Sequence, residues 1–269
     1  MILRRVIAHF RKQEWTAIFL DFLIVVVGVF VGIQVSNWND ARADQQRAQG
    51  YLERIGADLD TDIAAIVERT AFWRQVADYG ALGLDYAETG NARDHTQWEF
   101  LLAYFQASQV SELIPAQATY DELKSAGEMG LIGDLDFRNA LSNYYKFPAA
   151  PTLTERPPYR QHVRGIIPVD IQKYIWDACY ASNPAGDQEM HSCPSPISEQ
   201  RAAEIVDAIA GDAALMSELR YWMSTMHVAS LIGRDRTAGA TALRQSVDAR
   251  LSGRRMGRLS GATSPHKAP

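Results

Sequence analysis

The chain has 269 residues, a net charge of −5 and an isoelectric point of about 5.7. Hydrophobic residues make up 47% of it and charged residues 22%, a balance that excludes a wholly disordered chain. The acidic balance disfavours a dedicated nucleic-acid binder, and two cysteines are too few for a disulfide scaffold or a four-cysteine zinc site.

An apolar run near the amino terminus predicts a transmembrane helix over residues 15–38. Ala17–Val35 holds 14 Ile, Leu, Phe or Val residues among 19, and about 20 residues cross the hydrocarbon core of a bilayer. These side chains favour insertion by about 6 kcal/mol, which outweighs the cost of Asp21 at about 3 kcal/mol or less. Trp15 and Trp38 flank the run and are the predicted membrane anchors at its two interfaces.

The basic residues around this span predict its orientation. Residues 1–14 form a basic segment with four Lys or Arg side chains against one acid, whereas only Arg42 and Arg47 follow the span closely. The positive-inside rule therefore places the amino terminus in the cytoplasm and the rest of the chain outside it. A cleavable signal peptide is the alternative, because Ala41 and Ala43 offer a small-residue cleavage site.

One face of the span carries an unusual set of side chains. At 100° per residue, Asp21, Val25, Gly28, Gly32 and Asn39 fall within about 40° of one line. The two glycines allow a second helix to approach closely, and a carboxylate on the same face needs a donor. This stripe predicts helix–helix packing in the membrane. The alternative is that glycine is simply common in membrane helices and that Asp21 is hydrated at the cytoplasmic headgroups.

Residues 39–251 are predicted to form an extracytoplasmic helical domain. Apolar residues recur every three or four positions through residues 37–69, which indicates a helix that leaves the membrane. Asp58, Asp60 and Asp62 lie off that stripe and are predicted to form a solvated acidic face. Residues 70–112 are rich in aromatic residues and predict a helix–turn–helix with Asp94 as a possible N-cap. Their helical spacing favours core packing over a ligand cage.

The carboxyl-terminal half divides at prolines and cysteines. Five prolines mark residues 148–170 as a connector. Cys179 and Cys193 bound a loop over 179–193 and are predicted to pair in an oxidising compartment; free thiols, or a metal site using His191, are the alternatives. A helix that breaks at Gly211 and a last helix over 238–251 follow, and residues 252–269 are predicted to be a flexible basic tail.

Motifs of known chemistry are missing from the sequence. It contains no nucleophile elbow, zinc-protease motif, phosphate loop or dinucleotide fingerprint. The prediction is therefore no catalytic residue, no metal ligand and no cofactor. His227 is expected to be a packed core histidine; an enzyme of unrecognised type would need a titratable cluster around Glu99, Asp121 or His227.

Two segments carry a resemblance to a family. Gly32-Ile33-Gln34-Val35-Ser36-Asn37-Trp38-Asn39 ends the apolar run, and Thr119–Gly127 precedes a short helix that ends in Tyr144-Tyr145. Over residues 1–147 this pattern resembles an uncharacterised family of bacterial single-pass membrane proteins. The resemblance implies a topology and carries no activity.

Together these observations predict an all-α protein in which one transmembrane helix continues into an extracytoplasmic helical bundle. The expected place is the bacterial inner membrane, with a single pass and a periplasmic domain. The predicted role is a non-enzymatic interaction, accessory or scaffold subunit whose partners are the lipid bilayer and another membrane protein or a second copy of itself, with no nucleic acid. A periplasmic ligand-binding or sensor-like module, with the aromatics of 70–112 lining a pocket, is the alternative.

Overall fold

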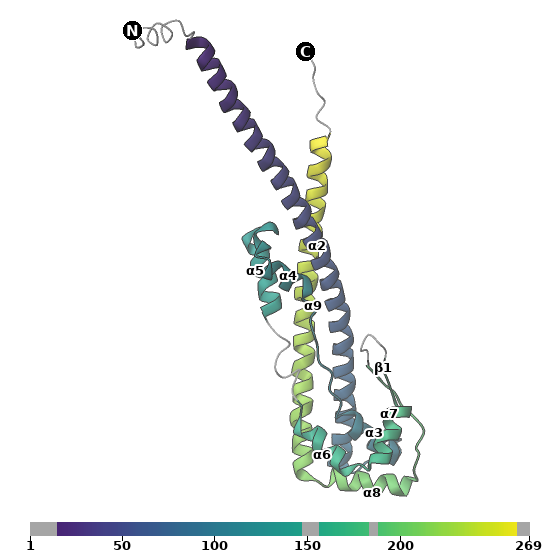
Figure 1. Ribbon diagram of the computed structural model, residues 1–269. Coiled ribbons are helices and arrows are strands. Elements are labelled where there is room, and N and C mark those ends of the chain that lie inside the picture. Colours follow the sequence, from purple (N-terminus) through teal and green to yellow (C-terminus); the bar gives the residue numbers. More distant parts are fainter. Residues whose placement is uncertain (1–14, 147–155, 183–187, 263–269) are drawn as a thin grey trace, which may run out of the picture.

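The computed structural model describes residues 15–146, 156–182 and 188–262. Two long helices, α2 (Trp15–Thr89) and α9 (Ala213–Ala262), form its body (Figure 1). Between them come α3 (Gln97–Gln106), α4 (Ala118–Ser125), the 3-10 helix η1 (Glu128–Leu131), α5 (Leu135–Lys146), α6 (Pro158–Ile166), α7 (Val169–Ala178) and α8 (Glu199–Ala210). The predicted all-α class is confirmed. Within the described residues its one departure is an antiparallel hairpin of β1 (Tyr180–Ser182) and β2 (Gln188–Met190).

The helices α2 and α9 run antiparallel and touch through glycines. A Cβ built on Gly56 would lie 3.5 Å from Val247 Cγ1, and one built on Gly80 would lie 1.9 Å from Met223 Sδ. Later residues of α2 therefore face earlier residues of α9, as expected for an antiparallel pair. At Gly80 a Cβ would need the side chain of Met223 to move, whereas at Gly56 it would make ordinary van der Waals contact. Gly80 therefore lets the two helix axes approach each other.

Two hydrophobic cores lie along this pair of helices. The first core lies nearer the apolar end of α2 and joins α2 and α9 to α4, η1 and α5. Its buried side chains include Leu52, Ile55, Leu59, Leu123, Phe137, Leu141 and Val247. The second core is the head, where α3, α6, α7 and α8 pack on the distal ends of α2 and α9 (Figure 1). Its largest fully buried side chains include Trp73, Trp222, Tyr104, Tyr159, Phe100 and Phe105.

The aromatic residues of 70–112 fill the head core, as their spacing predicts. Trp73, Phe100, Tyr104 and Phe105 are almost completely buried. The helix–turn–helix is also confirmed, with the turn at Gly90, whose φ of 64° ends α2. The N-cap of α3 is Thr96 rather than Asp94, because Thr96 and Glu99 form a capping box.

The helices α8 and α9 are separated at Gly211, where the sequence predicts a break. Asp212 accepts hydrogen bonds from the backbone N–H groups of Ala214 and Leu215, and so caps the new helix after Gly211. The shorter turn before α5 follows the same rule. Gly133 has a φ of 63°, and Asp134 Oδ1 then accepts from Phe137 N at 2.8 Å.

Two predicted boundaries in the carboxyl-terminal half are wrong. The connector over 148–170 contains the helix α6 from Pro158, because proline is tolerated in the first turn of a helix, where its missing N–H needs no partner. The tail over 252–269 is helical as far as Ala262, since α9 is one helix from residue 213 and adding residues to an existing helix is easier than starting one. Residues 147–155 and 263–269 lie outside the described part of the chain.

Candidate functional site

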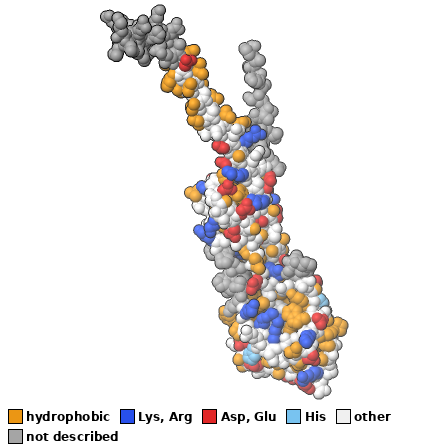
Figure 2. All heavy atoms as spheres, in the orientation of Figure 1, with side chains coloured by type: hydrophobic (Ala, Val, Ile, Leu, Met, Phe, Trp, Pro, Cys, Tyr) orange, Lys and Arg blue, Asp and Glu red, His pale blue; other side chains and the backbone are white. Residues whose placement is uncertain are grey.

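The apolar part of α2 is the most exposed hydrophobic surface of the described chain. Every described residue from 19 to 43 is exposed, and the first buried residue of the helix is Ala48. This segment is the one candidate membrane span found among the described residues. In Figure 2 hydrophobic side chains cover the projecting arm of α2, whereas charged side chains cover the body next to it. Exposing so much apolar surface to water costs free energy, so we expect a bilayer or another protein to cover it.

The predicted packing stripe lies open on this arm. Val25 is 63% exposed, and a Cβ built on Gly28 or Gly32 would meet nothing within 4 Å. Asp21 and Asn39 are exposed on the same helix. No part of the described chain covers these five positions, so helix–helix packing through them stays a prediction about a partner.

Of the two predicted anchors, the structure describes the side chain of Trp38. Trp38 is 63% exposed, and the guanidinium of Arg42 lies over its ring, 5.7 Å from the ring centroid. A tryptophan with a cation one turn further on suits the headgroup region, where an aromatic ring meets water and charge. Trp15 begins α2, and its side chain lies outside the described part.

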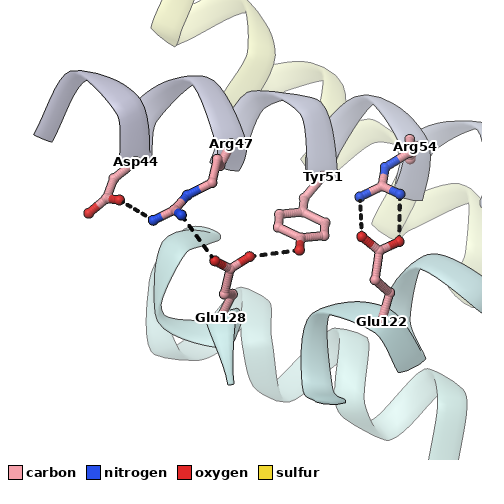
Figure 3. Close-up of polar contacts among 6 residues, drawn as sticks. All are labelled: Asp44, Arg47, Tyr51, Arg54, Glu122 and Glu128. Carbon is pink, nitrogen blue, oxygen red and sulfur yellow. Dashed lines mark hydrogen bonds and ion pairs between the residues drawn. The ribbon is translucent and has the colours of Figure 1, made fainter. Parts of the chain in front are cut away.

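Polar contacts hold α4 and η1 against α2 just beyond the span (Figure 3). Glu128 of η1 accepts a hydrogen bond from Tyr51 Oη at 2.7 Å and lies 3.5 Å from Arg47 Nη1. Arg54 donates two hydrogen bonds to Glu122, at 2.6 and 3.0 Å. The hydrogen bond to Glu128 raises the pKa of Tyr51, and the Arg54 guanidinium lowers the pKa of Glu122. Arg54 and Glu122 are half exposed, so their ion pair adds little stability. Tyr51 is buried, and its hydrogen bond to Glu128 fixes how η1 lies on α2.

Asp58, Asp60 and Asp62 of α2 each bind a group from another segment of the chain. Asp62 is buried and accepts hydrogen bonds from the backbone N–H of Ala116 and from Tyr144 Oη at 2.9 Å. Burial raises the pKa of this carboxyl. Asp58 accepts from the backbone of α4, and Asp60 pairs with an arginine of α9. The predicted solvated face is therefore wrong for Asp62, because hydrogen-bond donors from two other segments replace its water.

The predicted disulfide is present. Cys179 and Cys193 are bonded with their Cα atoms 5.2 Å apart, and the described chain has no free cysteine. Trp98 Nε1 donates to the carbonyl of Cys193, and Gln106 Nε2 donates to the carbonyl of Cys179, so the crosslinked hairpin is held on α3. His191 belongs to no group of three metal-binding side chains in the described part of the chain.

The head also contains a cavity that the sequence analysis missed. Its volume is about 540 Å³, and Arg156, Arg160 and Arg164 line one wall. Arg160 and Arg164 lie about one turn apart on α6, and Arg156 precedes the first residue of that helix, Pro158. The expected connector over 148–170 left this helix out, so the sequence did not predict that these arginines meet.

The residues considered for catalysis have other environments. Glu99 accepts from Thr96 in the capping box of α3, which lowers the pKa of its carboxyl. Asp121 and His227 are both exposed, so the prediction of a packed core histidine is wrong for His227.

Comparisons with models of known protein families, with curated proteins and with solved structures give no match. The resemblance to bacterial single-pass membrane proteins therefore stays a prediction from the quoted residues.

Proposed function

We propose that this protein is a membrane-anchored accessory or scaffold subunit that packs on another membrane protein through α2. The observation that carries the proposal is the open apolar arm of α2: it is exposed from residue 19 to residue 43, while the same helix forms the core of the bundle further on. The anchor and the folded body thus share one helix, and a partner bound in the membrane fixes the position of the whole body.

The stripe on the arm supports packing against a second helix. Gly28 and Gly32 leave a shallow strip on which another backbone can lie closely, and Asp21 places a carboxylate on that strip. A carboxylate in the apolar part of a membrane is costly without a donor, so a partner with a polar or basic side chain at that depth satisfies it.

The basic residues before the span and the disulfide after it support one topology. Residues 1–14 lie outside the described part, but their composition favours the cytoplasm. The Cys179–Cys193 bond favours an oxidising compartment for the head. Both arguments lead to an inner-membrane protein with a periplasmic body, and they rest on independent features.

A pull-down in mild detergent tests this proposal. The full chain with a carboxyl-terminal tag is purified from native membranes beside the Gly28→Leu, Gly32→Leu double variant. The matched control is Val26→Leu, Phe30→Leu, whose positions lie about 140–180° from Asp21 on the same helix. A stoichiometric membrane partner that is lost in the glycine variant and kept in the control is the expected result. A chain that returns alone and monomeric in all three samples would overturn the proposal.

A periplasmic ligand-binding or sensor-like module is the second candidate function. The aromatics of 70–112 do not favour it, since they fill the head core. The arginine cavity does, because it offers a hollow with charged groups on its wall.

A further inference from the structure

The arginine cavity lies in the head, far from the membrane end of the molecule. Ser111, one of its lining residues, accepts a hydrogen bond at its backbone carbonyl from Trp73 Nε1 at 3.1 Å. Trp73 lies 35 residues along α2 from Trp38, which is about 52 Å at 1.5 Å per residue. The headgroups around the anchor are therefore out of reach, and a ligand must arrive from solution.

Three positive charges share one wall of this cavity. Arg160 and Arg164 are half-buried, and the pKa of each guanidinium is lowered, mainly by burial; that of Arg164 falls to about 9. Arg156 adds like-charge repulsion to Arg160. Arginines at this depth are normally paired with a carboxylate, because a buried charge is costly without a counter-charge.

The acceptors on these arginines are neutral. Arg160 Nη1 donates to the carbonyl of Ser108 at 2.7 Å, and Arg164 donates to Ser108 Oγ at 3.0 Å and Gln109 Oε1 at 3.1 Å. Within the described residues none of the three arginines forms an ion pair with a carboxylate. Glu112 also lines the cavity, and no ion pair of the described chain joins it to them. Among the described residues, therefore, no carboxylate is paired with the positive charge of this wall.

One arginine of the site, Arg164, is held in place before any ligand arrives. The guanidinium of Arg164 lies 4.7 Å from the ring centroid of Phe105 and 5.2 Å from that of Trp176. Stacking against these two rings and hydrogen bonds to Ser108 and Gln109, which follow α3, hold this side chain in one place. A guanidinium held in this way loses little freedom when its planar fork binds two oxygens of an anion.

We propose that the arginine cavity binds a small soluble oxyanion, meaning a molecule that carries a phosphate or carboxylate group. Arg156 and Arg160 supply donors, Arg164 supplies fixed charge, and the side chains of Ser111, Gln161 and Gln188 supply neutral partners on the remaining walls. A volume of about 540 Å³ fits this class, since small-molecule sites are commonly about 300–1,000 Å³.

Isothermal titration of the full chain in detergent tests the site, with inorganic phosphate and citrate as probes. Sodium chloride at matched ionic strength is the blank. Arg156 is exposed and has no hydrogen bond or ion pair with the described residues, so Arg156→Gln leaves the fold intact. Loss of one charged hydrogen bond should weaken binding by roughly tenfold or more. Glu112→Gln should strengthen binding, because it removes the carboxylate found among the described lining residues.

The matched control is Arg201→Gln, which removes an exposed arginine of α8 that pairs with Glu204. Its affinity for the probes should equal that of the parent chain. Saturable binding that weakens in Arg156→Gln, strengthens in Glu112→Gln and is unchanged in Arg201→Gln supports the proposal. No saturable heat with either probe up to about 10 mM, or an equal loss in Arg201→Gln, would overturn it and leave the pull-down result untouched.

Discussion

Three glycines of α2 provide a graded test of the packing between the long helices and the head. A Cβ built on Gly83 would lie 2.6 Å from Tyr104 Cε1, and one on Gly50 would meet nothing within 4 Å. Tyr104 is fully buried, and its hydroxyl donates to the carbonyl of Gly83 at 2.7 Å. The ring therefore cannot turn away from a new methyl group, whereas at Gly80 the flexible, half-buried side chain of Met223 can.

The expected magnitudes follow from two opposing terms. Alanine in place of a helical glycine stabilises a protein by about 0.5–1 kcal/mol, and overpacking a core costs about 1–3 kcal/mol. Gly50→Ala should therefore raise the free energy of unfolding by about 0.5–1 kcal/mol. Gly83→Ala should lower it by about 2–2.5 kcal/mol, because the rigid ring places its overpacking cost near the upper limit. Gly80→Ala should lie between the two.

Thermal unfolding of the full chain in one detergent, followed by circular dichroism, measures the order. A protein of this size shifts in Tm by about 2–4 °C per kcal/mol. The expected order of Tm is Gly50→Ala first, Gly80→Ala second and Gly83→Ala last. If Gly83→Ala melted at or above the parent, α2 and α3 would not pack as described.

Three further predictions concern the crosslink, the buried aspartate and a helix cap. Reduction of Cys179–Cys193 should lower the free energy of unfolding by about 3 kcal/mol, as measured in urea with and without reductant; equal midpoints would contradict a structural bond. Burial raises the pKa of Asp62 in the folded state, so its contribution to the free energy of unfolding should fall as pH rises from about 4 through that raised pKa. Urea titrations at several pH values measure this slope of the free energy of unfolding against pH, and Asp62→Asn should make it smaller. An unchanged slope in Asp62→Asn would exclude Asp62 as its source. Thr96→Ala should cost about 1 kcal/mol through the lost cap of α3, and Thr96→Ser should recover most of it in the same melting assay.

The features that the sequence predicts correctly depend on local chemistry. The apolar run forms one exposed helix that is long enough to be a candidate span, and this depends only on residues within the run. The helix–turn–helix within 70–112 and the break at Gly211 need only residues that lie within a few positions of each other. The chain has two cysteines, so Cys179 has Cys193 as its one possible partner within the chain.

The features that the sequence does not predict depend on contacts between distant segments. Gly233 lies inside α9, where glycine weakens a helix, yet its missing Cβ makes room for Thr70, and packing on α2 offsets the weakness. Asp62 belongs to an acidic row that suggests solvent, and donors 54 and 82 residues away bury it. The arginine cavity needed a helix starting at Pro158, and five nearby prolines pointed to a connector instead.

The continuity of α2 has a mechanical consequence. One helix without a break runs from the apolar arm to the head, so a change in the direction of the arm changes the position of the head. With about 52 Å between Trp38 and Trp73, a change of about 10° in the tilt of the span would sweep the cavity sideways by about 9 Å. A partner that resets the tilt in the bilayer would thereby decide which neighbouring surface the arginines face.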